Sequence, residues 1–204
     1  MDIKTLANIT STLGEKLKSF SDQDFEYNYF EIECKDLPLP RYEGESIYKY
    51  NSLKDFFSNL NVHKDYPYVY WFEVTDHITC EEIREIIRKY TDEIRNEIFL
   101  KVDKNSRNFY SVPAMTKHIK KRDSKVLYVG KVKKDLAGRL VPHLGYYHRS
   151  PNTQGLQLSR WAKDLNLNLK FHFIRLPKEL KELTSFYEFQ IAKDLKPILG
   201  RHSG

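Results

Sequence analysis

Apolar and polar residues follow one another along this chain in blocks that predict helices and strands in turn. Residues 3–20 place an apolar side chain at every third or fourth position, which is the spacing of one face of a helix. Residues 25–33 alternate apolar or aromatic positions with polar, mostly acidic ones, which predicts a strand with one solvent-facing side. Prolines and a glycine interrupt the pattern between residues 38 and 44, and Ser52 is placed to cap a short helix.

The strongest strand pattern of the first half covers residues 66–74, where aromatic and β-branched side chains predominate. A long charged helix is predicted next, because isoleucines recur at helical spacing from Ile83 to Ile98. Thr79 and Glu82 have the spacing of a capping box, which indicates that this helix begins directly after Thr79.

Short strands and helices also alternate in the second half. Residues 126–129 and 170–176 have the alternation of strands, and Asp135 is placed to cap a helix between them. Residues 156–165 have helical spacing, and a last amphipathic helix follows Pro177. The mixture predicts an α+β fold with a small, mostly antiparallel central sheet flanked by helices.

Composition narrows the class of protein. The chain has 204 residues, of which 40% are hydrophobic and 14% aromatic, and this is ample for a packed core. It contains no apolar run of the roughly 18 residues that a membrane span needs, and its start lacks the pattern of a signal peptide. We therefore expect no membrane partner and a cytoplasmic location. Cys34 and Cys80 indicate neither a disulfide framework nor a thiolate zinc site, because their spacing is irregular.

The net charge of +6 is unevenly distributed. Residues 1–114 contain 15 Lys and Arg against 21 Asp and Glu, a net charge of −6, whereas residues 115–204 contain 19 against 7, a net charge of +12. A basic region of this kind predicts a polyanion such as DNA as partner, although a merely solvated basic face is the alternative. The expected nucleic-acid contacts are Lys117, Lys120, Lys121, Arg122, Lys133, Lys134, Arg149 and Lys196.

The most specific chemistry lies at the junction of a predicted strand and a predicted helix. Residues 127–131 read Leu-Tyr-Val-Gly-Lys, and Arg139 and His143 follow on the helix. Their separation places both side chains on one helix face, although Pro142 predicts that the helix is kinked or starts late. A phenol, a guanidinium and an imidazole at one junction suit chemistry on a phosphodiester.

Glu188 is the candidate metal ligand. On a helical wheel it falls at the edge of the apolar arc, and no basic residue lies three or four positions away. A carboxylate near a buried seam needs either a distant cation or a metal ion as compensation. Both interpretations remain open at this point.

Together these segments resemble the GIY-YIG nuclease family. That family has a strand with Gly-Ile-Tyr, a strand with Tyr-Ile-Gly, a helix with Arg and often His, a later metal-binding Glu and a closing Lys-Pro segment. The resemblance covers residues 66–204, and residues 1–65 would then be an N-terminal extension, packed on the core. The corresponding positions are Tyr128, Gly130, Arg139, His143, Glu188 and the segment 196–200.

The first strand of the family pattern is the least clear part of the resemblance. Tyr70 is the candidate for its tyrosine, although Tyr68 stands where the family has glycine. The long separation from Tyr128 requires an insertion at about residues 75–125. Tyr110 is the alternative, and it is weaker because the strand around it would end early at the nearby Pro113.

The closing segment also departs from the family pattern. Gly200 stands where the family has Asn. Any hydrogen bond that this Asn provides must therefore be missing or come from a neighbour such as Arg201 or His202.

The resemblance implies a metal-dependent DNA endonuclease of the restriction, mobile-element or repair type. Glu188 would hold Mg²⁺, with Mn²⁺ as a possible substitute. Tyr70 would act as general base or orient the attacking water, helped by His143, whose ordinary pKa suits proton transfer. The phosphate contacts would come from Arg139, Tyr128 and Lys131. Cutting double-stranded DNA requires an active site for each strand, so we expect a homodimer if the duplex is the substrate.

Two other functions are compatible with the sequence. Asp24, Glu33 and Lys35 match the loose D…E-x-K pattern of another nuclease superfamily. The altered first strand and Gly200 are also compatible with a non-catalytic nucleic-acid-binding module on a degenerate nuclease scaffold.

Overall fold

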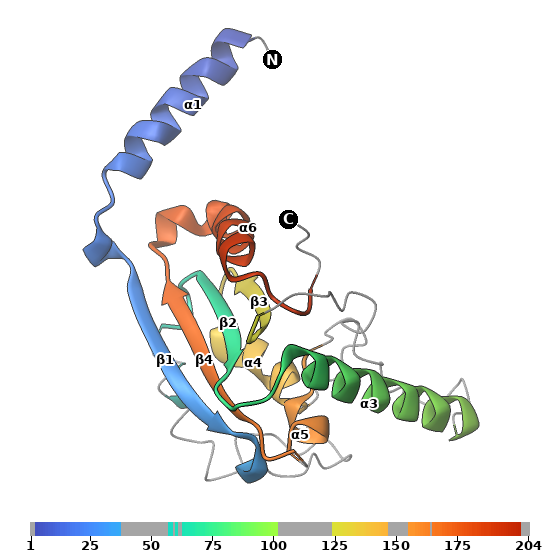
Figure 1. Cartoon of the computed structure of the whole chain (residues 1–204). Coiled ribbons are helices and arrows are strands. Elements are labelled where there is room, and N and C mark those ends of the chain that lie inside the picture. The colour runs from blue at the N-terminus through green and yellow to red at the C-terminus, as the bar shows by residue number, and fades with distance from the viewer. Residues whose placement is uncertain are drawn as a thin grey trace.

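Four strands form one antiparallel sheet in the computed structural model, in the order β1-β4-β2-β3 (Figure 1). The structure describes residues 3–37, 57–58, 60, 63–101, 124–146, 155–163 and 165–200. The strands are β1 (Glu26–Glu33), β2 (Tyr68–Val74), β3 (Val126–Val132) and β4 (Asn168–Arg175). The predicted α+β class and the mostly antiparallel sheet are confirmed.

Helices flank this sheet on both faces. None of the helices in the described part of the chain combines the length and apolar character that a membrane span needs. The helices are α1 (Ile3–Lys18), α3 (Cys80–Lys101), α4 (Leu136–Leu144), α5 (Leu158–Trp161) and α6 (Thr184–Leu195).

Strand alternation divides the buried side chains into two layers. Tyr70 and Phe72 of β2 point to the inner face, where they pack with residues of α3, α4 and α5. Val69 of β2 and Val129 of β3 point to the outer face, where Ala192 of α6 packs against them. The inner and outer faces of the sheet are named in this sense below.

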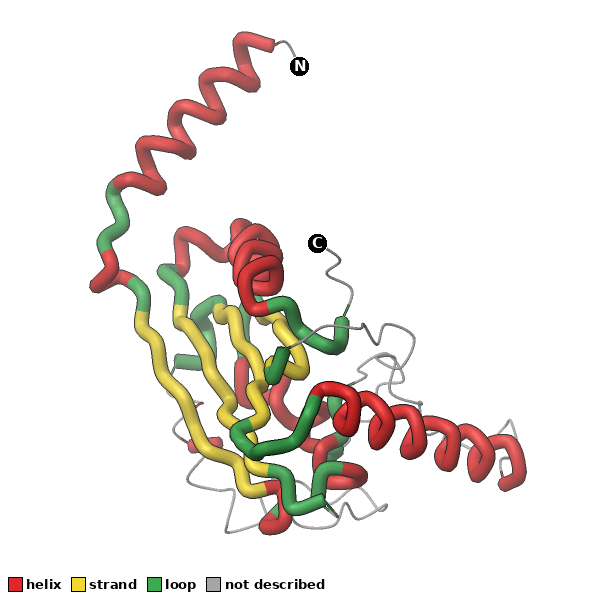
Figure 2. The backbone as a smooth tube through the Cα atoms, in the orientation of Figure 1, coloured by secondary structure: helices red, strands yellow, loops and turns green. Residues whose placement is uncertain are grey.

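The strand predicted at residues 25–33 is an integral part of the sheet. β1 pairs with β4 over its whole length, from Glu26 opposite Arg175 to Glu33 opposite Asn168. Figure 2 shows the four strands side by side, with β1 at one edge. The proposed division of the chain at residue 65 stays a prediction. Helix α1 projects away from the sheet, and Leu17 near its end joins the outer layer together with Phe20 and Phe25, which follow it (Figure 1).

Two predicted helices differ from the expectation. α4 begins at Leu136 and continues through Pro142 to Leu144, so the helix does not start late. Pro142 has no N–H, and it therefore removes one ladder bond near the end of the helix. Gly145, at φ 99°, then ends the helix, and its N–H donates to the Pro142 carbonyl. The helix expected over residues 156–165 is shorter and covers only Leu158–Trp161.

The closing segment after α6 runs parallel to β3. The N–H of Ile198 donates to the Val126 carbonyl at 2.9 Å, and the N–H of Leu199 donates to the Leu127 carbonyl at 2.8 Å. Because of this pairing, Gly200 lies beside the ring of Tyr128. The closing segment, which the family resemblance assigns to the site, therefore lies next to Tyr128.

Candidate functional site

Gly130 of β3 leaves room for two phenols. It lies opposite Tyr70 in the antiparallel register of β2 and β3. A Cβ atom at Gly130 would lie 2.6 Å from the Tyr70 hydroxyl oxygen and 2.5 Å from Cε1 of Tyr128, closer than atoms can pack. The glycine of the Tyr-Val-Gly segment is therefore what allows both tyrosine rings to lie over this strand.

Helix α4 directs its two polar side chains at one of these phenols. Asp135 caps the helix, since its Oδ1 accepts a hydrogen bond from the Gly138 N–H at 3.0 Å. One turn further, Nε of Arg139 donates to the Tyr70 hydroxyl at 3.1 Å, and Nε2 of His143 lies 3.0 Å from the same oxygen. The predicted common face of Arg139 and His143 is thus the face that meets Tyr70.

The tautomer of His143 follows from its second contact. The backbone N–H of Leu156 donates to Nδ1 of His143 at 3.3 Å, so Nδ1 accepts and the ring proton sits on Nε2. His143 therefore donates to the Tyr70 oxygen. Its side chain is fully buried, and burial together with the Arg139 charge holds the pKa of His143 well below its usual value. This lowered pKa differs from the ordinary value that the sequence suggested for His143, and its role in proton transfer stays a prediction.

The two phenols differ in accessibility. Tyr70 is 1% exposed, and burial raises its pKa above the ordinary value. Tyr128 and Arg139 are partly exposed, and the guanidinium also hydrogen bonds the Tyr128 hydroxyl. An incoming anion would therefore meet Arg139 and Tyr128 first, with Tyr70 and His143 behind them.

Lys131 and Glu188 form the second half of the site. Because neighbouring residues of a strand point to opposite faces, Lys131 lies on the outer face and Gly130 on the inner one. Nζ of Lys131 lies 2.6 Å from Oε2 of Glu188, which is 6% exposed on α6. Burial is the largest cause that raises the pKa of Tyr70 and Tyr128, and the nearby negative charge of Glu188 raises the pKa of both further. The six expected site residues thus lie around one segment of β3, divided between its two faces.

Glu188 suits a magnesium ion only as the single protein ligand of that ion. In the described part of the chain no three His, Cys, Asp or Glu side chains are grouped as a metal site. Mg²⁺ is commonly held by one or two carboxylates, with water and substrate phosphate oxygens completing its octahedron. Glu188 fits that arrangement, but Lys131 competes with any cation for its Oε2 atom.

The expected DNA contacts are located only in part. Lys133 and Lys134 are exposed just after β3, and Lys133 forms an ion pair with Glu182. Lys196 is exposed at the end of α6. The alternative tyrosine, Tyr110, lies outside the described ranges. So do the remaining predicted DNA contacts, which are Lys117, Lys120, Lys121, Arg122 and Arg149.

The geometry does not favour the D…E-x-K alternative. Asp24 accepts a hydrogen bond from Ser21 before β1, whereas Glu33 and Lys35 form an exposed ion pair at the other end of that strand. At about 3.3 Å per residue, the intervening strand is roughly 23 Å long. Asp24 and Glu33 therefore cannot hold one metal ion.

Comparison of the chain with known proteins finds no matching family model, no matching curated protein and no matching solved structure.

Replacing His143 by asparagine is expected to flatten the acid dependence of stability. The folded protein keeps His143 neutral, whereas the unfolded chain protonates it below about pH 6.5, so acidification favours unfolding. This contributes about 1.4 kcal/mol per pH unit to the loss of unfolding free energy below that pH. Denaturant unfolding between pH 7 and 5 measures it.

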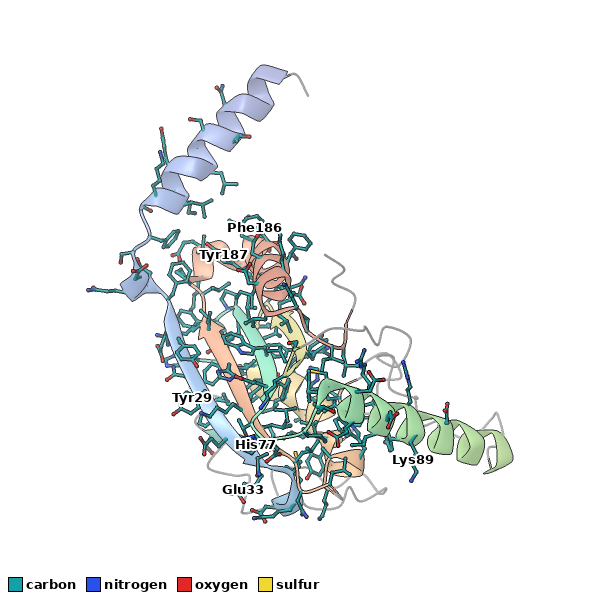
Figure 3. All side chains as sticks on the ribbon, in the orientation of Figure 1. Tyr29, Glu33, His77, Lys89, Phe186 and Tyr187 are labelled. Atoms are coloured by element: carbon teal, nitrogen blue, oxygen red, sulfur yellow. The ribbon has the colours of Figure 1, made fainter. Side chains whose placement is uncertain are left out.

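The matched control is His77, an exposed histidine labelled in Figure 3. We expect His77→Asn to keep the wild-type slope. A slope for His143→Asn as steep as that of the wild type would contradict the buried, neutral imidazole.

Proposed function

We propose that the protein is a metal-dependent DNA endonuclease with a GIY-YIG-like centre. One observation supports this above the others: a guanidinium and an imidazole from α4 both donate to the Tyr70 hydroxyl directly over Gly130. Core packing alone does not require a buried phenol to receive two such donors. The arrangement combines a phosphate-binding cation with a phenol whose oxygen is held in position.

In this proposal the accessible groups bind the scissile phosphate. Arg139 carries a permanent positive charge and lies partly exposed beside Tyr128, so both side chains can donate to phosphate oxygens. Glu188 would hold Mg²⁺ on the other side of β3, and the bound ion would neutralise charge that develops on the phosphate oxygens. Lys131 would move from Glu188 to the phosphate, since both are anionic partners for its ammonium group.

Tyr70 would act on the attacking water. Its oxygen accepts hydrogen bonds from Arg139 and His143, and two donors stabilise the phenolate, which is the form that takes up a proton. Burial opposes this by raising the pKa of Tyr70. We therefore expect the cleavage rate to rise with pH above neutrality.

DNA is the proposed substrate because of charge. Residues 115–204 carry a net charge of +12, and they include β3, α4 and α6. Cleavage of both strands of a duplex would require two copies of the site, which a homodimer would provide.

Tyr70→Phe tests the proposal most simply. The variant removes one hydroxyl, and we expect it to reduce nicking of plasmid DNA in Mg²⁺ by about 10²-fold and to abolish the rise of rate with pH. Tyr68→Phe is the matched control, because Tyr68 lies on the same face of β2, is also buried, and donates its hydroxyl proton to the His63 carbonyl. Unchanged cleavage by Tyr70→Phe with a loss in Tyr110→Phe would transfer the role to Tyr110.

A non-catalytic DNA-binding module is the second candidate. It is favoured by the Lys131 to Glu188 ion pair, which compensates the buried acid without any metal ion. Salt-sensitive DNA binding by the wild type, without nicking in Mg²⁺ or Mn²⁺, would support this function and refute the nuclease.

A further inference from the structure

A second group of polar side chains lies on the outer face of the sheet, on strands other than β3. The Tyr27 hydroxyl lies 2.8 Å from Nδ1 of His172, and Nε2 of His172 lies 3.0 Å from Oε2 of Glu73. The three residues come from the neighbouring strands β1, β4 and β2. The indole of Trp71 stacks on the imidazole, with centroids 4.8 Å apart and planes at 5°. The ring of His172 is therefore held from three sides.

The contacts of His172 fix the direction of these hydrogen bonds. A carboxylate only accepts, so the ring proton of a neutral His172 sits on Nε2 and is donated to Glu73. Nδ1 is then an acceptor and receives the proton of the Tyr27 hydroxyl. A hydroxyl, an imidazole base and an orienting carboxylate follow one another in the order of the nucleophile, base and acid of hydrolytic triads.

Exposure divides the roles within this group. Tyr27 is 53% exposed, so its oxygen is open to a reactant, whereas His172 is 7% exposed. Burial lowers the pKa of His172, although the Glu73 carboxylate opposes this. The imidazole is therefore neutral at pH 7 and able to accept a proton. The base is covered and the hydroxyl is accessible, as a nucleophilic site requires.

We propose that Tyr27 is a nucleophilic hydroxyl that accepts the acyl group of an uncharged activated ester, with His172 as its general base and Glu73 as the positioning residue. This proposal does not depend on the nuclease function. The Glu73 carboxylate lies 3.0 Å from Nε2 of His172, and its negative charge disfavours an anionic reactant such as a phosphate ester beside this group.

The step balances without any further reactant. The Tyr27 oxygen attacks the carbonyl carbon, a tyrosyl ester bond forms, and the bond from that carbon to the alkoxy or aryloxy group breaks. The leaving group departs with its electron pair, and the phenolic proton passes to Nδ1 of His172. The resulting imidazolium is stabilised by Glu73 and then loses its proton to water.

Tyr29 provides an internal control. It lies on the same strand and the same face, and its exposure of 51% nearly equals that of Tyr27. Its ring contacts Lys170 and His172, but no hydrogen bond of the described structure joins its hydroxyl to a base. Both tyrosines lie in the tryptic peptide of residues 19–35, so one spectrum compares them.

The test is acetylation by p-nitrophenyl acetate at pH 7, with the acetyl group located by fragment-ion mass spectrometry of that peptide. We expect Tyr27 to react on the order of 10²-fold faster than Tyr29, the usual contribution of a general base. His172→Gln should reduce the rate at Tyr27 to that at Tyr29. Glu73→Gln, which keeps the base, should reduce it about tenfold.

Equal rates at Tyr27 and Tyr29 would overturn the proposal, and so would an acetyl group found on His172 instead of Tyr27. Undiminished acetylation of Tyr27 in a folded His172→Gln protein would do the same. If His172→Gln does not fold, the acetylation rate of Tyr27 in Glu73→Gln tests the proposal instead. A reduced preference for Tyr27 over Tyr29 supports the role of His172 and Glu73, and an unchanged preference refutes it.

Discussion

Arg139→Ala is expected to reduce Mg²⁺-dependent cleavage of plasmid DNA by about 10³-fold while leaving DNA affinity within a few-fold of the wild type. The guanidinium hydrogen bonds both phenols, so its loss removes the charge that would face a bound phosphate. A positioned donor of this kind commonly contributes 10²- to 10³-fold to the rate. Binding persists because many other cations of the basic half remain.

The control for this variant is Arg175→Ala. Arg175 is also partly buried, but it pairs with Glu26 and lies over the ring of Tyr66, away from β3. Single-turnover rates at saturating enzyme separate the chemical step from binding. Equal cleavage by Arg139→Ala and the wild type would show that the guanidinium does not act on the phosphate.

Glu188→Gln is expected to abolish the response of cleavage to Mg²⁺, with a loss of about 10³-fold or more. The change keeps the shape of a side chain that is 6% exposed, and it removes only the charge that would hold a cation. The measurement is the rate of plasmid nicking as a function of Mg²⁺ concentration.

Glu182→Gln is a closely matched control. Both acids form an ion pair with a lysine. Glu188 pairs with Lys131 of β3, and Glu182 pairs with Lys133, which directly follows β3. Glu182 is largely exposed, so its carboxylate has no special role and its loss should leave cleavage unchanged. If both variants retain full activity, Glu188 is only the buried partner of Lys131.

The sequence predicted the local features of the site because local rules determine them. The Asp135 cap, the capping box of Thr79 and Glu82, and the shared face of Arg139 and His143 each depend on residues within one or two turns. The strand around Tyr70 was recognisable from its aromatic and β-branched composition. The pairing of this strand with β3 places Tyr70 opposite Gly130, and the role of Tyr70 in the site stays a prediction.

Long-range features were not predictable in the same way. The partner of Glu188 is Lys131, which is distant in sequence, and no periodicity relates the two. The neutral state of His143 depends on complete burial and on a backbone N–H of Leu156, for which no side chain gives a signal. The place of β1 beside β4 likewise depends on a pairing across most of the chain.

A double-mutant cycle tests most directly whether groups on both faces of β3 act on one phosphate. Arg139→Lys, Glu188→Asp and the double variant are compared with the wild type in single-turnover cleavage, because these conservative changes keep the rates measurable. Shared action on one phosphate predicts that the double variant is about as slow as the slower single variant. A double variant slowed by the product of the two single losses, or a wild type that does not cleave in Mg²⁺ or Mn²⁺, would contradict it.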